Sequence, residues 1–127
     1  MMTKREKVMK SMDWRIVYFK ERSGRSPIEE FINKLERDEQ VEVAVAIDML
    51  RTHGIALRRP WVGSLGKSLW ELRIRTGRQI RILYFLHSGR AFVLLHAFVK
   101  KTREVPQTEV AIANRRMNEY LRRATNG

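Results

Sequence analysis

The sequence contains no cysteine, which excludes disulfide bonds and thiolate metal sites and is compatible with a cytoplasmic protein. It also lacks any apolar run that approaches the roughly 18 residues of a membrane-spanning helix. The first residues, MMTKREKVMKSMD, have no apolar stretch of the kind that a secretory signal requires. We therefore expect no membrane association, and we interpret residues 1–13 as a basic N-terminal extension.

Acidic residues are scarce in one part of the chain. The whole protein has 26 Lys and Arg against 14 Asp and Glu, which gives a net charge of +12. Residues 58–103 contain 11 of the basic residues and a single acid, Glu71, whereas residues 1–57 are close to balance. Such a concentration of positive charge favours a polyanionic partner, and nucleic acid above all.

The 127 residues are enough for one compact domain with a hydrophobic core. Ser26-Pro27 is typical of a helix start, with Ser as the N-cap and Pro as the first helical residue. Helical spacing continues to His53-Gly54, as two helices or as one with a break near Asp38. A last helix is predicted from Pro106 to about Ala124.

Strand-like runs complete the pattern. They are rich in β-branched and aromatic residues and are separated by turn residues, at 14–19, 69–75, 79–87 and 91–100. Residues 55–68 contain one Pro and two Gly, and we expect a loop there. The order strand, two helices, three antiparallel strands and helix predicts a single α+β domain over residues 14–124, with the helices on one face of the sheet.

Alternation of side chains along these strands predicts two different sheet faces. One face carries apolar residues throughout, including Val93, Leu95, Ala97 and Val99 of the last strand, and should lie under the helices. The other face combines basic and aromatic side chains. Guanidinium groups bind phosphate and aromatic rings stack on bases, so this face is suited to RNA. Its residues are Arg73, Arg81, Phe85, His96, Phe98 and Lys100.

Ordinary structural roles remain open for most of these residues. The chain has three histidines, no cysteine and few acidic residues near the histidines, and it has no paired carboxylate, Gly-rich phosphate loop or Ser-His-Asp set. We therefore expect neither a metal nor a cofactor. The alternative roles are core packing for Trp70 and Phe98, an ion pair for Glu71 and Arg73, solvent exposure for Arg75 and Arg78, and an internally hydrogen-bonded histidine for His96.

Several stretches in succession carry a resemblance to a known family: WRIVYF, SPIEEFINKL, SLWELRI, QIRILYF and VLLHAFVKKTREVPQTEVAIA. Together they resemble the RelE/ParE toxin superfamily, and within it the phage-derived, HigB-type toxins of type II toxin–antitoxin modules. The resemblance covers about residues 14–120. Its most specific parts are LWELR, RILYF and LHAFVKKT. Ala97 stands where the family often has Gly.

This resemblance implies a RelE-like fold, similar to the small microbial RNases, and a ribosome-dependent mRNA endonuclease that inhibits translation. It also implies a cognate antitoxin, HigA-like with a helix-turn-helix domain. In such an enzyme the 2′-hydroxyl of the RNA attacks the adjacent phosphate, so the protein must stabilise charge and move protons. The implied catalytic residues are Arg73 and Arg81 as phosphate clamps, Lys100 or Lys101 at the leaving oxygen or as base, and His96 as the alternative base. RNA contacts are expected from Glu71, Arg75, Arg78, Phe98 and Arg103.

Two other functions remain open. A ParE-like inhibitor of DNA gyrase would share the fold and much of the strand pattern. A non-catalytic module that binds RNA or the ribosome would need the same charge but no particular lysine. The sequence FVKK at residues 98–101 and the long last helix favour the HigB-type interpretation.

Overall fold

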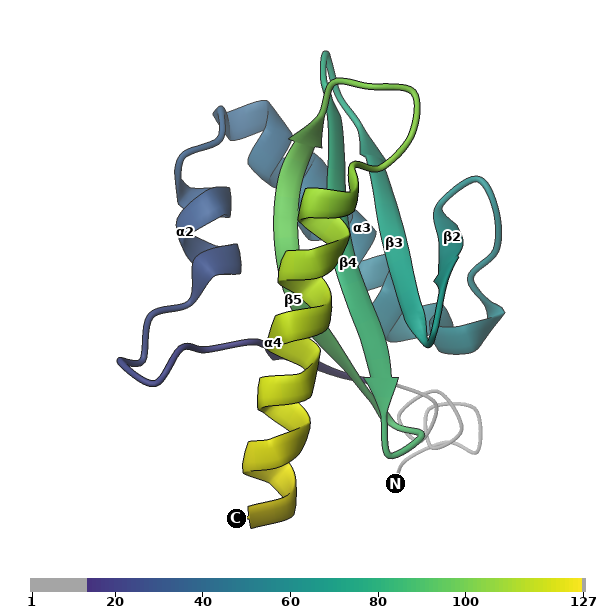
Figure 1. Cartoon of the computed structure of the whole chain (residues 1–127). Coiled ribbons are helices and arrows are strands. Elements are labelled where there is room, and N and C mark those ends of the chain that lie inside the picture. Colours follow the sequence, from purple (N-terminus) through teal and green to yellow (C-terminus); the bar gives the residue numbers. More distant parts are fainter. Residues whose placement is uncertain (1–13, 127) are drawn as a thin grey trace, which may run out of the picture.

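The computed structural model describes residues 14–126, within which the chain forms one five-stranded sheet and three α-helices (Figure 1). The predicted α+β class is therefore confirmed. Residues 1–13, the predicted basic extension, lie outside the described residues, as does residue 127. No helix in the described part of the chain is long and apolar enough to cross a membrane. In chain order the elements are β1 (Arg15–Tyr18), α2 (Pro27–Asn33), α3 (Arg37–His53), the 3₁₀ helix η1 (Gly54–Ala56), β2 (Val62–Gly66), β3 (Leu69–Arg75), β4 (Gln79–His87), β5 (Ala91–Lys100) and α4 (Gln107–Asn126).

The helices α2 and α3 begin and end at local signals. The Ser26 hydroxyl accepts a hydrogen bond from the backbone N–H of Glu29 at 3.4 Å, and Pro27 is the first residue of α2. The break between the two helices lies at residues 34–36, just before the predicted position near Asp38. At its other end α3 gives way to Gly54, whose φ is 57°. A Cβ at this position would lie 2.0 Å from the indole nitrogen of Trp14, so only glycine fits.

The sheet has the strand order β1-β5-β4-β3-β2, with β1 parallel to β5 and the other pairs antiparallel. The edge strand β2 lies within residues 55–68, so the prediction of a loop throughout that segment was wrong. Glycines at 63 and 66 resemble a loop sequence. An edge strand tolerates them because it pairs on one side only, here with β3, and the pairing is interrupted by a bulge between Ser64 and Gly66.

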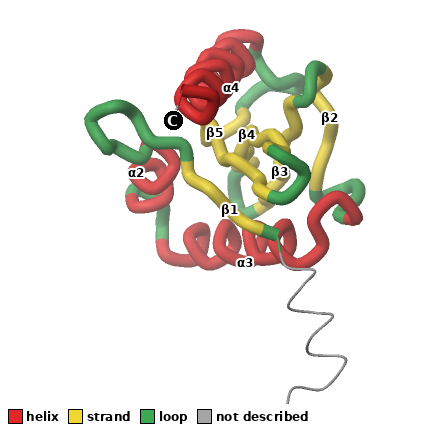
Figure 2. The backbone as a smooth tube through the Cα atoms, turned by 90° about the horizontal axis from the view of Figure 1, so that it is seen from below, coloured by secondary structure: helices red, strands yellow, loops and turns green. Residues whose placement is uncertain are grey.

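Helices cover both faces of the sheet (Figures 1 and 2). Apolar residues of α2 and α3 pack on one face, against Leu72 and Ile82 among others. The helix α4 packs on the opposite face, where Ala113 lies among Leu83 and Phe98. The prediction that helices cover a single face was therefore wrong. The apolar stripe of α4 has no room on the first face and forms a second core on the other.

A shift of register divides β5 into two halves. Opposite Leu83 and Tyr84 the pairing with β4 skips one residue of β5, which is a β-bulge. The predicted common face of the strand was therefore wrong, because an extra residue reverses the alternation. Val93 and Leu95 face α4, whereas Ala97 and Val99 pack against the core below α3.

Candidate functional site

Three rows of paired residues cross β3, β4 and β5 on the side of the sheet that faces α4. The pairing places Glu71 beside Leu83 and Arg73 beside Arg81, with β5 completing each row. Side chains of one row project from the same face. The structure therefore brings together seven of the predicted site residues: Glu71, Arg73, Arg75, Arg81, His96, Phe98 and Lys100.

Two guanidinium groups converge on one buried carboxylate, and we call Glu71, Arg73 and Arg81 the arginine cluster. The Nε of Arg73 donates a hydrogen bond of 2.8 Å to Oε1 of Glu71. The Nε of Arg81 lies 3.4 Å from the other carboxylate oxygen. The Glu71 side chain is only 6% exposed. One negative charge thus holds two positive charges at the surface of the sheet, with a net charge of +1.

The two arginines differ in access. The Arg73 side chain is 31% exposed, whereas that of Arg81 is 5% exposed. Arg81 donates hydrogen bonds to the carbonyl of Ile80 at 3.2 Å and to the side chain of Gln79 at 3.0 Å. Burial lowers the pKa of Arg81, although an arginine remains protonated. Arg73 is therefore the guanidinium that reaches solvent, and Arg81 lies beneath it.

The contact between Arg81 and Glu71 is incomplete. Within residues 14–126, the Nε of Arg81 and the Oε2 of Glu71 are buried and have no hydrogen-bond partner. Buried polar atoms without a partner are uncommon because each costs free energy. A contribution to stability alone does not explain why these two buried atoms lack hydrogen-bond partners, and this marks the cluster as a candidate functional site.

Gly63 of the edge strand makes room for Arg73. A Cβ at Gly63 would lie 2.3 Å from an Nη atom of Arg73, so the guanidinium group lies directly over this glycine. No pattern along the chain singled out Gly63, because its segment was interpreted as a loop. Its importance follows from the pairing of β2 with β3.

His96 is hydrogen-bonded on both sides of its ring by residues of α4. Its Nε2 lies 3.0 Å from Oε1 of Glu109, and its Nδ1 lies 3.3 Å from Nη1 of Arg116. A guanidinium can only donate, so Nδ1 accepts and Nε2 carries the proton. Burial lowers the pKa of His96, and the Glu109 carboxylate opposes that shift. Phe98 stacks on this ring with centroids 5.5 Å apart and is itself buried.

Glu109 and Arg116 did not appear among the predicted site residues. Their spacing with Ala113 places them on one face of a helix, which is the only sequence signal for them. Nothing in the sequence showed that this face would lie on the sheet.

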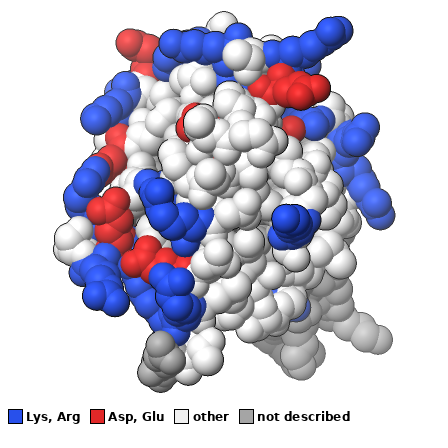
Figure 3. All heavy atoms as spheres, viewed as in Figure 1, with Lys and Arg blue, Asp and Glu red and all other residues white. Residues whose placement is uncertain are grey.

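The lysines and Arg103 lie where β5 leads into α4. The Nζ of Lys100 donates a 2.6 Å hydrogen bond to the carbonyl of Arg103. Lys101 and Arg103 themselves are exposed. Figure 3 shows Lys and Arg side chains gathered at the top of the molecule, where Figure 1 places this segment and the turn between β3 and β4. Exposed positive charge therefore adjoins the arginine cluster.

Arg78 is not part of this arrangement. Its guanidinium forms a two-pronged ion pair with Glu39 of α3, at 2.8 and 3.0 Å. The hydrogen bonds from Arg78 and Thr76 lower the pKa of Glu39 to about 2. The predicted RNA contact at Arg78 would therefore come from a guanidinium that is held to α3 by this ion pair and whose side chain is 49% exposed.

Comparison with known families adds a second kind of evidence. Residues 30–118, well over half of the chain, match the family described as "Phage derived protein Gp49-like (DUF891)". No curated protein matches the sequence. The matched segment includes the arginine cluster, both lysines and the α4 residues that hold His96. The chain therefore belongs to the phage-derived Gp49-like family, which is part of the RelE/HigB toxin-like group.

Proposed function

We propose that this protein is the toxin of a type II toxin–antitoxin module and that it cleaves mRNA on the ribosome. The family is associated with toxin endoribonuclease activity, which supports the reaction class. The observation that carries the proposal is the convergence of Arg73 and Arg81 on Glu71, on the same sheet face as Lys100. Such a group of fixed cations can bind a phosphodiester and stabilise the charge that develops during its cleavage.

The proposed reaction needs little covalent chemistry from the protein. The 2′-oxygen of the RNA forms a bond to the adjacent phosphorus, and the bond from phosphorus to the 5′-oxygen breaks. The products are a 2′,3′-cyclic phosphate and a free 5′-hydroxyl. The attacking hydroxyl loses a proton and the leaving oxygen gains one. The enzyme must align these atoms and neutralise the extra negative charge on the phosphate.

The geometry suggests distinct roles within the arginine cluster. Arg73 is partly exposed and would contact the phosphate directly, while Glu71 holds its guanidinium in place through Nε. Arg81 is buried behind it and adds positive charge without leaving the sheet. Glu71 is thus a positioning residue, and Arg73 is the proposed catalytic arginine.

The structure also bears on the choice of base. For His96 to accept a proton at Nδ1, it must lose the hydrogen bond from Arg116, because the other nitrogen already carries a proton. Lys100 and Lys101 are not restricted in this way. The Nζ of Lys100 has a backbone carbonyl as its partner, and Lys101 is exposed. We assign the proton transfers to one of these lysines, which takes the proton of the 2′-hydroxyl and gives it to the leaving 5′-oxygen, with mRNA positioned by the ribosome.

The test is cleavage of a defined mRNA in a reconstituted translation reaction, with and without ribosomes, read by primer extension. Arg73→Ala is the informative variant, because its side chain is the partly exposed member of the cluster, and thermal melting checks that the variant is folded. Arg22→Ala removes the same charge from an exposed turn and is the matched control. Removing one group that stabilises the transition state costs roughly 100- to 1,000-fold in rate. We expect ribosome-dependent cuts with the wild type and the control and a loss of that size in Arg73→Ala.

Other outcomes would redirect the interpretation. Equal cleavage without ribosomes would contradict the ribosome dependence. No cleavage under any condition would favour a gyrase inhibitor or a non-catalytic module. A DNA supercoiling assay would then separate these two, because only a gyrase inhibitor would alter supercoiling.

The family suggests an antitoxin partner. We propose that this partner is HigA-like, with a helix-turn-helix domain, and that the pair acts in the cytoplasm, where mRNA is translated.

A further inference from the structure

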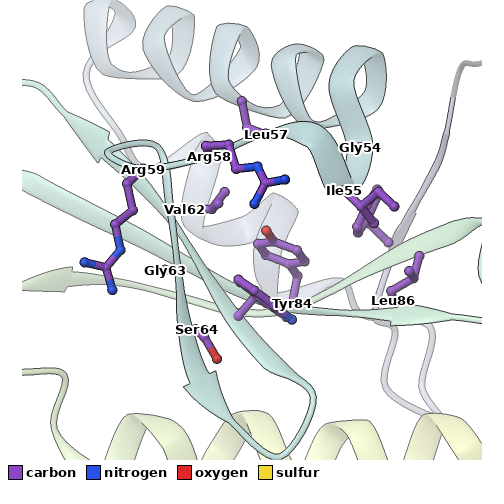
Figure 4. Close-up of a pocket in the computed structure, with 12 residues that line it drawn as sticks. Gly54, Ile55, Leu57, Arg58, Arg59, Val62, Gly63, Ser64, Tyr84 and Leu86 are labelled. Carbon is purple, nitrogen blue, oxygen red and sulfur yellow. The ribbon is translucent and has the colours of Figure 1, made fainter.

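A pocket of about 660 Å³ lies on the other side of the sheet from the arginine cluster (Figure 4). Its floor is apolar and consists largely of the buried side chains of Val62, Tyr84 and Phe92. Tyr84 and Phe92 belong to the core below α2 and α3, whereas the arginine cluster lies on the α4 side. The volume is within the range of roughly 300–1,000 Å³ that is typical of binding pockets.

Large apolar side chains are left exposed at the mouth of this pocket. Ile55 is 67% exposed and Trp70 is 40% exposed. Leu72 and Ile74 project from the same face of β3 as Trp70, and both are buried. The exposure of Trp70 is therefore local to its end of the strand. Trp70 is not among the residues packed against the core below α2 and α3, and it borders the pocket instead.

Two exposed apolar side chains meet at this pocket. Six large apolar side chains are exposed among the described residues, and of these Ile55 and Trp70 line the pocket together although they come from different parts of the chain. Exposed apolar side chains that lie together over an apolar hollow are typical of an interaction site, whereas scattered single residues are not.

The rim of the pocket is positively charged. Arg58 and Arg59 line it, and among the described residues no acidic side chain does. Figure 4 shows the guanidinium of Arg58 turned toward the pocket. An apolar floor with cations at the edge is complementary to an apolar side chain flanked by carboxylates. A small-molecule site would instead place several polar groups inside the cavity to orient its ligand.

We propose that this pocket is the docking site of the antitoxin. A bulky apolar side chain of the antitoxin enters the pocket beside Trp70, and neighbouring acidic residues pair with Arg58 and Arg59. This inference rests on the proposed function, since it assumes that the protein is a toxin with such a partner. The pocket and the arginine cluster face opposite ways, so an antitoxin bound here does not compete with RNA for Arg73. Neutralisation then results from keeping the bulky complex out of the ribosome.

The test uses the protein encoded by the reading frame adjacent to this one as the probe. Its affinity for the full-length chain is measured by isothermal titration calorimetry. Ile55→Ser and Arg58→Glu are the test variants, because both residues are exposed and the fold should tolerate the changes. Leu121→Ser and Arg122→Glu are the matched controls, on the outer surface of α4. Central interface residues contribute at least about 2 kcal/mol, which corresponds to a loss of about 30-fold in affinity. We expect losses of that size in the two test variants and changes below about threefold in the controls.

The same variants are assayed for mRNA cleavage without the probe, and thermal melting confirms that each is folded. Unchanged cleavage together with weakened binding supports the inference. Full affinity in both test variants, or no binding of the probe to the wild type, overturns it. Loss of cleavage with intact probe binding would assign the pocket to RNA and also overturn it. If the wild type cleaves no mRNA but the test variants still lose the probe, the enzymatic proposal fails while the docking site stands.

Discussion

Arg81 and Glu71 form a buried ion pair, and removing one partner should cost more free energy than removing both. Their side chains are 5% and 6% exposed, with Nε and Oε2 3.4 Å apart. In Arg81→Met, Glu71 would remain buried with less compensation, and breaking a buried pair costs about 3–5 kcal/mol. Glu71 keeps a second partner in Arg73 at 2.8 Å, so we expect the lower end, about 3 kcal/mol of unfolding free energy.

Urea titration and thermal melting provide the measurement. At roughly 2.1 cal/mol/K of unfolding entropy per residue, a loss of this size lowers the melting temperature of this domain by about 10 °C. The double variant Arg81→Met/Glu71→Leu removes both charges and replaces them with apolar side chains. Its stability should return to within about 1 kcal/mol of the wild type. A cost below about 1 kcal/mol in Arg81→Met, or a double variant no more stable than Arg81→Met, would refute the reasoning.

Two further predictions follow from the contacts of the sheet. Gly63→Ala should displace the guanidinium of Arg73 and lower mRNA cleavage about tenfold or more, with little change in melting temperature. Gly77→Ala is the control and should change neither quantity, because apart from the two neighbouring residues no atom of the described part of the chain lies within 4 Å of a Cβ at that position. Equal activity in both glycine variants would contradict the role given to Gly63. The pKa of Glu39 is about 2 in the folded protein against an ordinary value of 4.5, so its stabilising effect is complete above about pH 4.5 and is lost as the pH falls toward 2. Melting temperatures measured from pH 5 to pH 2 should therefore fall less steeply in Arg78→Gln, and an unchanged slope would count against the ion pair.

Most secondary structure was predictable because its signals are local. The three long strands at 69–75, 79–87 and 91–100 have the predicted boundaries, since alternating apolar residues and intervening turn residues define them along the chain. The start of α2 at Ser26-Pro27 was predictable for the same reason. The strand β2 was not, because its glycines match a loop and its only support is the pairing with β3.

The candidate site was partly predictable. Strand alternation placed Arg73, Arg81, His96 and Lys100 on one face, and the bulge in β5 lies before the last two and left that grouping intact. Alternation could not show that α4 packs on the same face. It is this helix that engages both ring nitrogens of His96.

The sequence by itself determined the fold class, the concentration of positive charge in residues 58–103 and the sheet face that carries it. Each of these depends on composition or on neighbours along the chain. Only the tertiary structure decided that Arg73 reaches solvent while Arg81 is buried, that Arg78 is bound to α3, and that an open apolar pocket lies behind the sheet. Burial and hydrogen-bond partners depend on residues far apart in the chain, and no local pattern in one sequence encodes which of them will meet.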